Sequence, residues 1–173
     1  MRPSIIHDEV KQIIATIVGS GNDDQKTALH MAIQNGQHGL VETLLQQGVD
    51  VNVEDDFGAT ALHLAAQSGN VEIMKTLLAI PSQDINSKDK QGYTALHWSV
   101  ENFDNEMIKI LIAKGAEINC SCDKNSTPLH LAVERDSIST VKCLLELGAD
   151  VNSKNIFGIV AANGNIPIAK ILI

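Results

Sequence analysis

Four histidines have nearly identical surroundings, and histidine is the side chain most often used for metal binding and for proton transfer near neutral pH. They are His30, His63, His97 and His130, and they end the tetrapeptides TALH, TALH, TALH and TPLH. The threonines that begin these tetrapeptides are 33, 34 and 33 residues apart. Two interpretations follow: shared metal or proton chemistry, or a structural motif that occurs once in each unit of a repeat.

Three cysteines are the other candidates for metal or nucleophilic chemistry: Cys120, Cys122 and Cys143. The pair Cys120-x-Cys122 could form half of a metal site, but no second pair follows at ligand spacing. The odd number indicates free thiols in a reducing compartment, not a disulfide framework. No nucleophile has an orienting base in the sequence pattern, and the glycines lack the Lys-Ser sequel of a phosphate-binding loop. We therefore expect no enzyme activity, no catalytic residue, no metal and no cofactor.

The charge balance excludes further classes of function. The chain has 13 basic and 21 acidic residues, a formal net charge of −8, which argues against nucleic-acid binding. No run of about 18 apolar residues is present, so membrane insertion is not expected. The N-terminal residues lack the apolar core and cleavage site of a signal peptide. We expect a cytoplasmic protein, with the nucleus or a host cytoplasm as alternatives.

A second marker shares the spacing of the histidine tetrapeptides. Acidic-apolar-Asn triplets occur at residues 50–52, 84–86, 117–119 and 150–152, with intervals of 34, 33 and 33. Each series of intervals contains one that is 34 residues long instead of 33. A single insertion between residues 60 and 84 explains both, most simply at residues 79–83. Two markers in the same register indicate a tandem repeat.

Each repeat has the internal pattern of two short helices and an extended loop. In residues 58–86, Thr60 can cap a first helix, whose small apolar face is followed by Gly69. Residues 71–78 predict a second helix, with Ile73, Met74, Leu77 and Leu78 on its apolar side. Neither helix can bury its apolar face alone, so neighbouring repeats must stack to form a continuous core.

From residue 58 to residue 78 the sequence reads GATALHLAAQSGNVEIMKTLL, and DIN follows at residues 84–86. This combination resembles the ankyrin repeat over about residues 22–173. The resemblance implies an all-α, right-handed ankyrin-repeat solenoid of stacked helix-turn-helix units with hairpin loops. We divide the chain into an N-terminal capping helix at residues 1–21, repeats at 22–54, 55–88, 89–121 and 122–154, and a partial, degenerate fifth repeat at 155–173.

The resemblance also implies that the threonine and the histidine of each tetrapeptide bond to each other and to local backbone, bracing the start of the first helix. The spacing agrees, because histidines one repeat apart cannot share a metal whose bonds are about 2 Å long. The four histidines are therefore predicted to be structural. We expect the asparagines at 52, 86, 119 and 152 to bond the backbone of their own turns.

Several residues depart from the repeat pattern. Residues 5–18 are amphipathic without the motif and are expected to cover the N-terminal end of the stack. Phe103 and Asp136 replace a helix-ending glycine, and Asn125 replaces a loop glycine, which a left-handed conformation tolerates. Relative to residues 58–70, five residues are missing between 158 and 165. Because the sequence stops within an expected helix, we expect it to be either a fragment of a longer array or a sequence that lacks residues.

Members of the family usually bind protein partners through the hairpin tips and the concave face of the first helices. By position, this surface consists of Asp56, Phe57, Gln67, Ser68, Lys90, Gln91, Tyr93, Glu101, Asn102, Asp123, Lys124, Ser126, Glu134 and Arg135. Tyr93 and Arg135 are the strongest candidates, because tyrosine and arginine are common in interface hot spots. Trp98 replaces leucine or methionine of the other repeats and is expected mainly in the core.

We therefore predict a protein-protein interaction module, a scaffold or adaptor, that is monomeric and binds a protein partner. Two alternatives remain open. The array can be the regulatory or targeting segment of a larger enzyme or channel. It can also be a host-directed effector of an intracellular microbe or a virus, which the many isoleucines and asparagines suggest.

Overall fold

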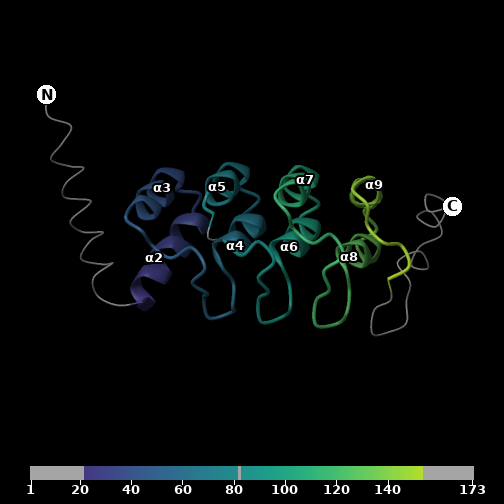
Figure 1. Ribbon diagram of the computed structural model, residues 1–173, viewed down its shortest axis with the longest axis horizontal. Coiled ribbons are helices and arrows are strands. Elements are labelled where there is room, and N and C mark those ends of the chain that lie inside the picture. The colour runs from purple at the N-terminus through teal and green to yellow at the C-terminus, as the bar shows by residue number, and fades with distance from the viewer. Residues whose placement is uncertain (1–21, 82, 154–173) are drawn as a thin grey trace, which may run out of the picture.

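A computed structural model describes residues 22–81 and 83–153, and these residues form helices and loops without a strand. The helices are α2 (Asn22–Gln34), α3 (His38–Gln46), α4 (Ala61–Ser68), α5 (Val71–Leu77), α6 (Ala95–Glu101), α7 (Asn105–Ala113), α8 (Pro128–Glu134) and α9 (Ile138–Glu146). They form four consecutive pairs, one for each predicted repeat (Figure 1). The predicted all-α array of stacked helix pairs is confirmed.

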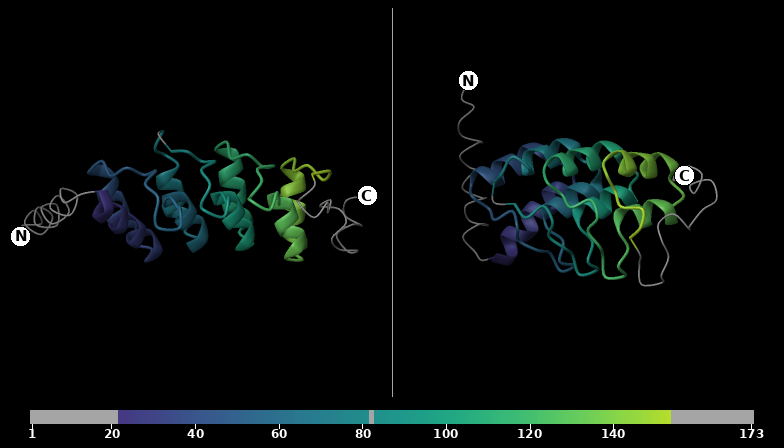
Figure 2. Two further views of the ribbon diagram at one scale, coloured as in Figure 1. Left: turned by 90° about the horizontal axis from the view of Figure 1, so that it is seen from below. Right: turned by 45° about the vertical axis from the view of Figure 1, so that its right-hand side comes forward.

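The helices lie in two rows, with the loops projecting from one side. The first helices of the repeats, α2, α4, α6 and α8, form an inner row beside the loops, and α3, α5, α7 and α9 form an outer row (Figure 1). The views in Figure 2 show the repeats following one another along a single line. Each inner helix packs against its own outer helix and against the inner helices of the adjacent repeats. We call the loops together with the exposed side of the inner helices the loop-side surface.

The core runs without interruption through the array between the two rows. Its largest fully buried side chains are Leu29, Ile33, Leu44, Ile73, Met74, Leu77, Leu96, Met107, Ile108, Leu111, Leu129 and Leu144. The small face of α4 is also buried, because Leu62, Ala65 and Ala66 lie between neighbouring inner helices. This arrangement explains the repetition: each helix pair has one apolar side facing the preceding repeat and one facing the next.

The inner helices of repeats 2, 3 and 4 begin directly after the threonines, as predicted. Thr60, Thr94 and Thr127 are the N-cap residues, with extended backbone. Repeat 1 differs, because α2 begins at Asn22 and Thr27 lies inside it, so the predicted helix start at Thr27 is wrong. Gln25 occupies the position that is glycine, with positive φ, in repeats 2 and 3. Glutamine favours helix and disfavours that turn, so the helix extends toward the N-terminus.

The positions where glycine is replaced retain the backbone conformation that glycine favours. Gly69, after α4, has φ 65°, and both Phe103 and Asp136, in the equivalent positions after α6 and α8, have φ 56°. Asn125, in the loop before α8, also has φ 56°. The left-handed conformation predicted at Asn125 is confirmed. Phe103 and Asp136 adopt it at helix ends that local backbone bonds close, such as that from the N–H of Phe103 to the carbonyl oxygen of Val100.

The extra residue of repeat 2 lies after its outer helix, which ends at Leu77 and is shorter than the other outer helices. Residues 78–81 turn through the sequence Leu-Ala-Ile-Pro, where the other repeats have a Gly-containing turn. The predicted capping helix at 1–21 and the whole of the partial repeat at 155–173 lie outside the described residues.

Candidate partner-binding surface

The histidine tetrapeptides of repeats 2, 3 and 4 form a brace at the start of their inner helices. In repeat 3, the backbone N–H of Thr94 donates to His97 Nδ1 at 3.1 Å, and Thr94 Oγ1 lies 3.0 Å from the same nitrogen. His97 Nε2 lies 3.3 Å from the carbonyl oxygen of Ser126, in the next repeat. A carbonyl oxygen only accepts, so Nε2 carries the proton and Nδ1 is the acceptor. Thr60 and His63 make the same pair of contacts to Nδ1, at 3.0 and 2.9 Å.

This brace also joins neighbouring repeats, and the burial of its imidazoles keeps them neutral. His63 Nε2 donates to the carbonyl oxygen of Tyr93 at 2.9 Å, which repeats the bond of His97 to the next loop. Burial lowers the pKa of His97 to about 4 and also lowers the pKa of His63. In each ring, Nδ1 bonds the threonine at the start of its own helix, and Nε2 holds the loop of the next repeat against that helix.

No cluster of three or more metal-ligating side chains lies within residues 22–81 and 83–153. The cysteines are free thiols and are buried. Burial raises the pKa of the Cys120 thiol, whose Sγ lies 3.5 Å from Thr94 Oγ1. The same cause raises the pKa of Cys143, so these thiols have the properties of core side chains and not of nucleophiles.

The loops that precede the inner helices are closed by aspartates. In repeat 2, Asp55 Oδ1 accepts the backbone N–H groups of Phe57 and Ala59, each at 2.8 Å. Asp89 Oδ1 does the same for Gln91 and Tyr93 at 2.9 Å. The side chains that follow these aspartates are therefore displayed on tight, internally bonded turns.

Adjacent loops are also bonded to each other. The backbone N–H of Lys90 donates to the carbonyl oxygen of Phe57 at 3.0 Å, and Lys90 Nζ donates to the carbonyl oxygen of Asp56 at 2.7 Å. The next pair of loops is joined by the N–H of Asp123 and the carbonyl oxygen of Gln91, 3.3 Å apart. The loop tips of repeats 2, 3 and 4 consequently form one continuous edge of the molecule.

The structure presents most of the predicted site residues on the loop-side surface. Those exposed are Asp56, Phe57, Gln67, Ser68, Lys90, Gln91, Asn102, Asp123, Lys124, Glu134 and Arg135. Tyr93 and Glu101 are half-buried, and Ser126 is buried at 4% exposure. Ser126 was expected on the surface by its loop position, but its carbonyl accepts from His97, and that contact turns the residue inward.

Several predicted contact residues also have partners within the array. Asn102 Nδ2 donates to the carbonyl oxygens of Ala66 and Gln67, at 2.9 and 2.8 Å, and so caps the inner helix of the preceding repeat. Arg135 Nη2 pairs with Glu101 Oε2 at 2.6 Å, also across a repeat boundary. Both residues therefore join neighbouring repeats, a role that their separation in the sequence concealed.

The aromatic residues of repeat 3 form a cluster instead of separate surface and core positions. The Tyr93 ring lies 5.3 Å from the His97 ring and 5.7 Å from the Trp98 ring, both tilted. Trp98 packs against the core but is only partly buried, and its Nε1 donates to Asp89 Oδ2 at 3.0 Å. The expectation that Trp98 lies mainly in the core is thus only partly correct, and sequence reasoning missed it as a surface residue.

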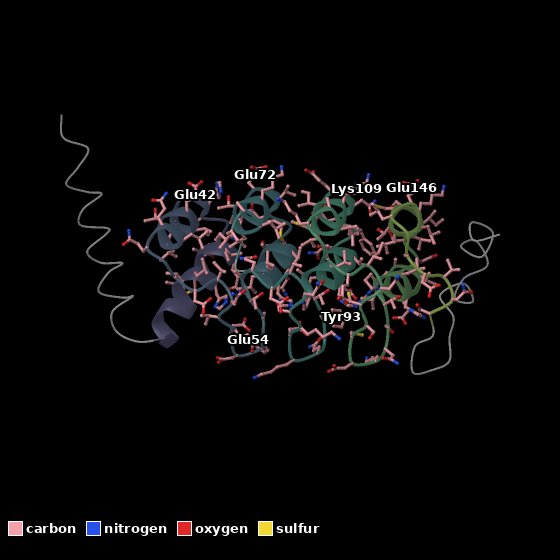
Figure 3. All side chains as sticks on the ribbon, viewed as in Figure 1. Glu42, Glu54, Glu72, Tyr93, Lys109 and Glu146 are labelled. Carbon is pink, nitrogen blue, oxygen red and sulfur yellow. The ribbon has the colours of Figure 1, made fainter. Side chains whose placement is uncertain are left out.

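Trp98 and Phe57 both line a small hollow between the loops and inner helices of repeats 2 and 3. The hollow measures about 110 Å³, and its other lining residues include Gln67, Asp89 and Gln91. Phe57 is 75% exposed, the most exposed large apolar side chain of the described residues. Figure 3 shows Tyr93 beside the loops and Lys109 on the outer row, on the opposite side of the array.

The triplet asparagines bond across repeats, not within their own turns as expected. Asn52 Oδ1 accepts the N–H of Asp84 at 3.2 Å, and Asn86 Oδ1 accepts that of Glu117 at 2.9 Å. Asn119 Oδ1 accepts the N–H of Asp150 at 2.8 Å. The partners are 31 or 32 residues apart in sequence, so only the stacking of the repeats brings them together.

Comparisons with known proteins agree with this geometry. The family model described as ankyrin repeats (3 copies) matches residues 6–89, 77–155 and 102–173. A comparison with curated proteins found no match. Within the described residues, no helix is long and apolar enough to span a membrane. Stacked helix pairs, braced Thr–His tetrapeptides and a family match along residues 6–173 lead to one conclusion: the chain belongs to the ankyrin-repeat family.

Proposed function

We propose that this array binds a partner protein through its loop-side surface, with the hollow between repeats 2 and 3 at the centre of the contact. Ankyrin repeats are generally protein-protein interaction modules. The observation that carries the proposal is the position of Phe57, an exposed aromatic side chain on a braced loop beside the half-buried Trp98. Aromatic anchors next to a pocket are typical of interface hot spots.

The rigidity of the loops supports this proposal. Asp55 and Asp89 close two of the loop tips, and backbone bonds join neighbouring loops. A surface that is already ordered loses little conformational entropy on binding, so more of the contact energy contributes to affinity. Complete burial of one large apolar side chain such as Phe57 contributes about 1.5–3 kcal/mol.

Several charged groups near the hollow already have partners within the array, which favours recognition by shape and apolar contact at this position. The ammonium group of Lys90 is held by the Asp56 carbonyl, and Arg135 is paired with Glu101. Asp89 accepts three N–H groups, including the indole N–H of Trp98. The exposed amides of Gln67 and Gln91 remain at the edge of the hollow as hydrogen-bonding groups for a partner backbone.

The test begins with affinity purification and mass spectrometry to identify a partner, followed by titration of substituted arrays. Phe57→Ala should weaken binding by about 2 kcal/mol, or about thirtyfold in Kd, because it removes the anchor. Arg135→Ala and Tyr93→Ala test the rest of the surface. Lys109→Ala, an exposed change on α7 in the outer row, is the control and should change Kd by less than about threefold. Weakening by Lys109→Ala with no effect of the loop-side substitutions would refute the proposal.

A further inference from the structure

A second surface feature lies on the outer row, away from the loop-side surface. A shallow groove of about 580 Å³ runs between the end of α3, the turn that follows it, and the end of α5. Its apolar lining comes from Leu45, Val49, Val51 and Ile80. Val49 and Val51 are 5% exposed, so they form a fixed floor.

Two departures from the repeat pattern meet at this groove. The first is Glu42, which occupies the position of Lys75, Lys109 and Lys142 in the other three repeats. The second is the one-residue insertion, which places Ile80 against the turn of repeat 1. Figure 3 shows Glu42 on the outer row with Lys109 and Glu146, on the opposite side of the array from Tyr93. Glu42 changes the charge at this groove, and the insertion changes the turn beside it. The other repeats fold without either change.

The groove combines an apolar floor with an acidic rim. Glu42 and Asp50 both line it, and the described residues of its lining include no lysine or arginine. The carboxylate of Asp50 is oriented by the N–H of Asn52, which Oδ1 accepts at 2.9 Å. His38 faces Glu42 from one turn earlier on α3, with Nε2 3.7 Å from Glu42 Oε1, and the same nitrogen lies 2.8 Å from Thr76 Oγ1.

From this geometry we propose that the groove is a second docking surface, which takes a partner segment with a lysine or arginine next to an aliphatic side chain. The aliphatic group packs on the partly exposed Leu45 and Ile80, and the cationic group pairs with Glu42 and Asp50. The complementary charge raises specificity and the association rate, and the net charge of −8 acts in the same direction. This surface is independent of the proposed loop-side contact.

A phage-displayed random-peptide library, selected on the full chain at low ionic strength, tests the proposal without a known partner. Recovered peptides are synthesised with a fluorophore, and their Kd values are measured by fluorescence anisotropy. We expect peptides that combine a basic and an aliphatic residue. Glu42→Lys, which restores the residue of the other three repeats, should weaken their binding at least about tenfold. The binding should also weaken as salt is added.

Matched variants separate the groove from the rest of the array. Ile80→Gln should also weaken binding, because it removes part of the apolar floor. Lys109→Glu, which places a carboxylate at the equivalent position of repeat 3, should create no new binding, and Phe57→Ala should leave these peptides bound. Thermal melts of each variant establish that it is folded. In NMR spectra recorded while the peptide is added, changes in the chemical shifts of the backbone amides of Gln46, Asp50 and Ile80 should show that the peptide binds in the groove.

Three results would overturn the proposal: no recovered peptide, enriched peptides without a basic residue, or binding that Glu42→Lys leaves unchanged. Peptides whose binding is lost with Phe57→Ala and retained with Glu42→Lys would likewise contradict it, although they would support the loop-side contact.

Discussion

Acidification should destabilise the array through His97, whose buried imidazole is neutral in the folded protein. Its pKa is about 4 when folded, against 6.5 for an unperturbed histidine. As the pH falls below about 6.5, the unfolded chain binds a proton that the folded chain excludes, so protonation favours unfolding. The stability contributed by the neutral ring is thus present above 6.5 and is lost progressively as the pH falls to about 4.

The size of the effect follows from the difference of about 2.5 pKa units between the two states. At about 1.4 kcal/mol for each unit, complete protonation corresponds to a loss of about 3 kcal/mol, of which about 2 kcal/mol is lost by pH 5. His63 acts in the same direction, since burial lowers its pKa as well. Protonation of carboxylates also changes stability in acid, so a variant without the histidine must isolate the contribution of His97.

His97→Asn is a suitable variant, because the amide oxygen can accept the N–H of Thr94 but the side chain does not titrate. Urea unfolding is followed by circular dichroism and by the fluorescence of Trp98, the one tryptophan of the chain. The variant should be less stable than wild type near neutral pH, since it loses the bond to Ser126. The difference in unfolding free energy should shrink by about 2 kcal/mol between about pH 7 and about pH 5.

Ile108→Val is the matched control, because it trims a fully buried side chain on α7 without removing a titratable group. It should lower the unfolding free energy by about 1 kcal/mol, with the same value at each pH. If the difference between wild type and His97→Asn also stays constant with pH, the imidazole is not excluded from protonation in the folded state. The argument from burial would then be refuted.

Two other substitutions test the bracing and the close contact of the loops. Thr94→Val should lower the unfolding free energy by about 1–2 kcal/mol, through loss of the hydroxyl that caps α6 and contacts His97; an unchanged thermal melt would contradict the bracing role. Gly92→Ala should destabilise by at least about 1 kcal/mol more than Gly48→Ala. Both glycines have positive φ, but a Cβ at Gly92 would lie 2.6 Å from the backbone nitrogen of Asp123, whereas at Gly48 it meets nothing within 4 Å. Equal melting temperatures for the two variants would show that the loops of repeats 3 and 4 move apart enough to accommodate the added methyl group.

The features that the sequence predicted correctly depend on short-range interactions. Thr60 caps a helix that His63 braces three residues later, and the apolar residues of residues 71–77 face one side of a single helix. Their recurrence at a nearly constant interval was sufficient to indicate the stacked array, because each repeat has apolar faces that only a neighbouring repeat can bury. Repeat 1 departs from this rule at Thr27, where the missing glycine decided the helix start.

The features that the sequence did not predict are contacts between repeats. Asn102 caps the helix of the preceding repeat, Asn86 bonds the next one, and the partners are 31–36 residues apart. Whether such side chains meet depends on the rotation and separation of adjacent helix pairs, which arise from packing along the whole core. The sequence alone therefore determined the repeat, its helices and the surface that faces outward. Tertiary packing decided which side chains of that surface join neighbouring repeats. It also brought Glu42 and Ile80 to one groove. Both outcomes depend on distances across repeat boundaries, which the order of residues does not specify.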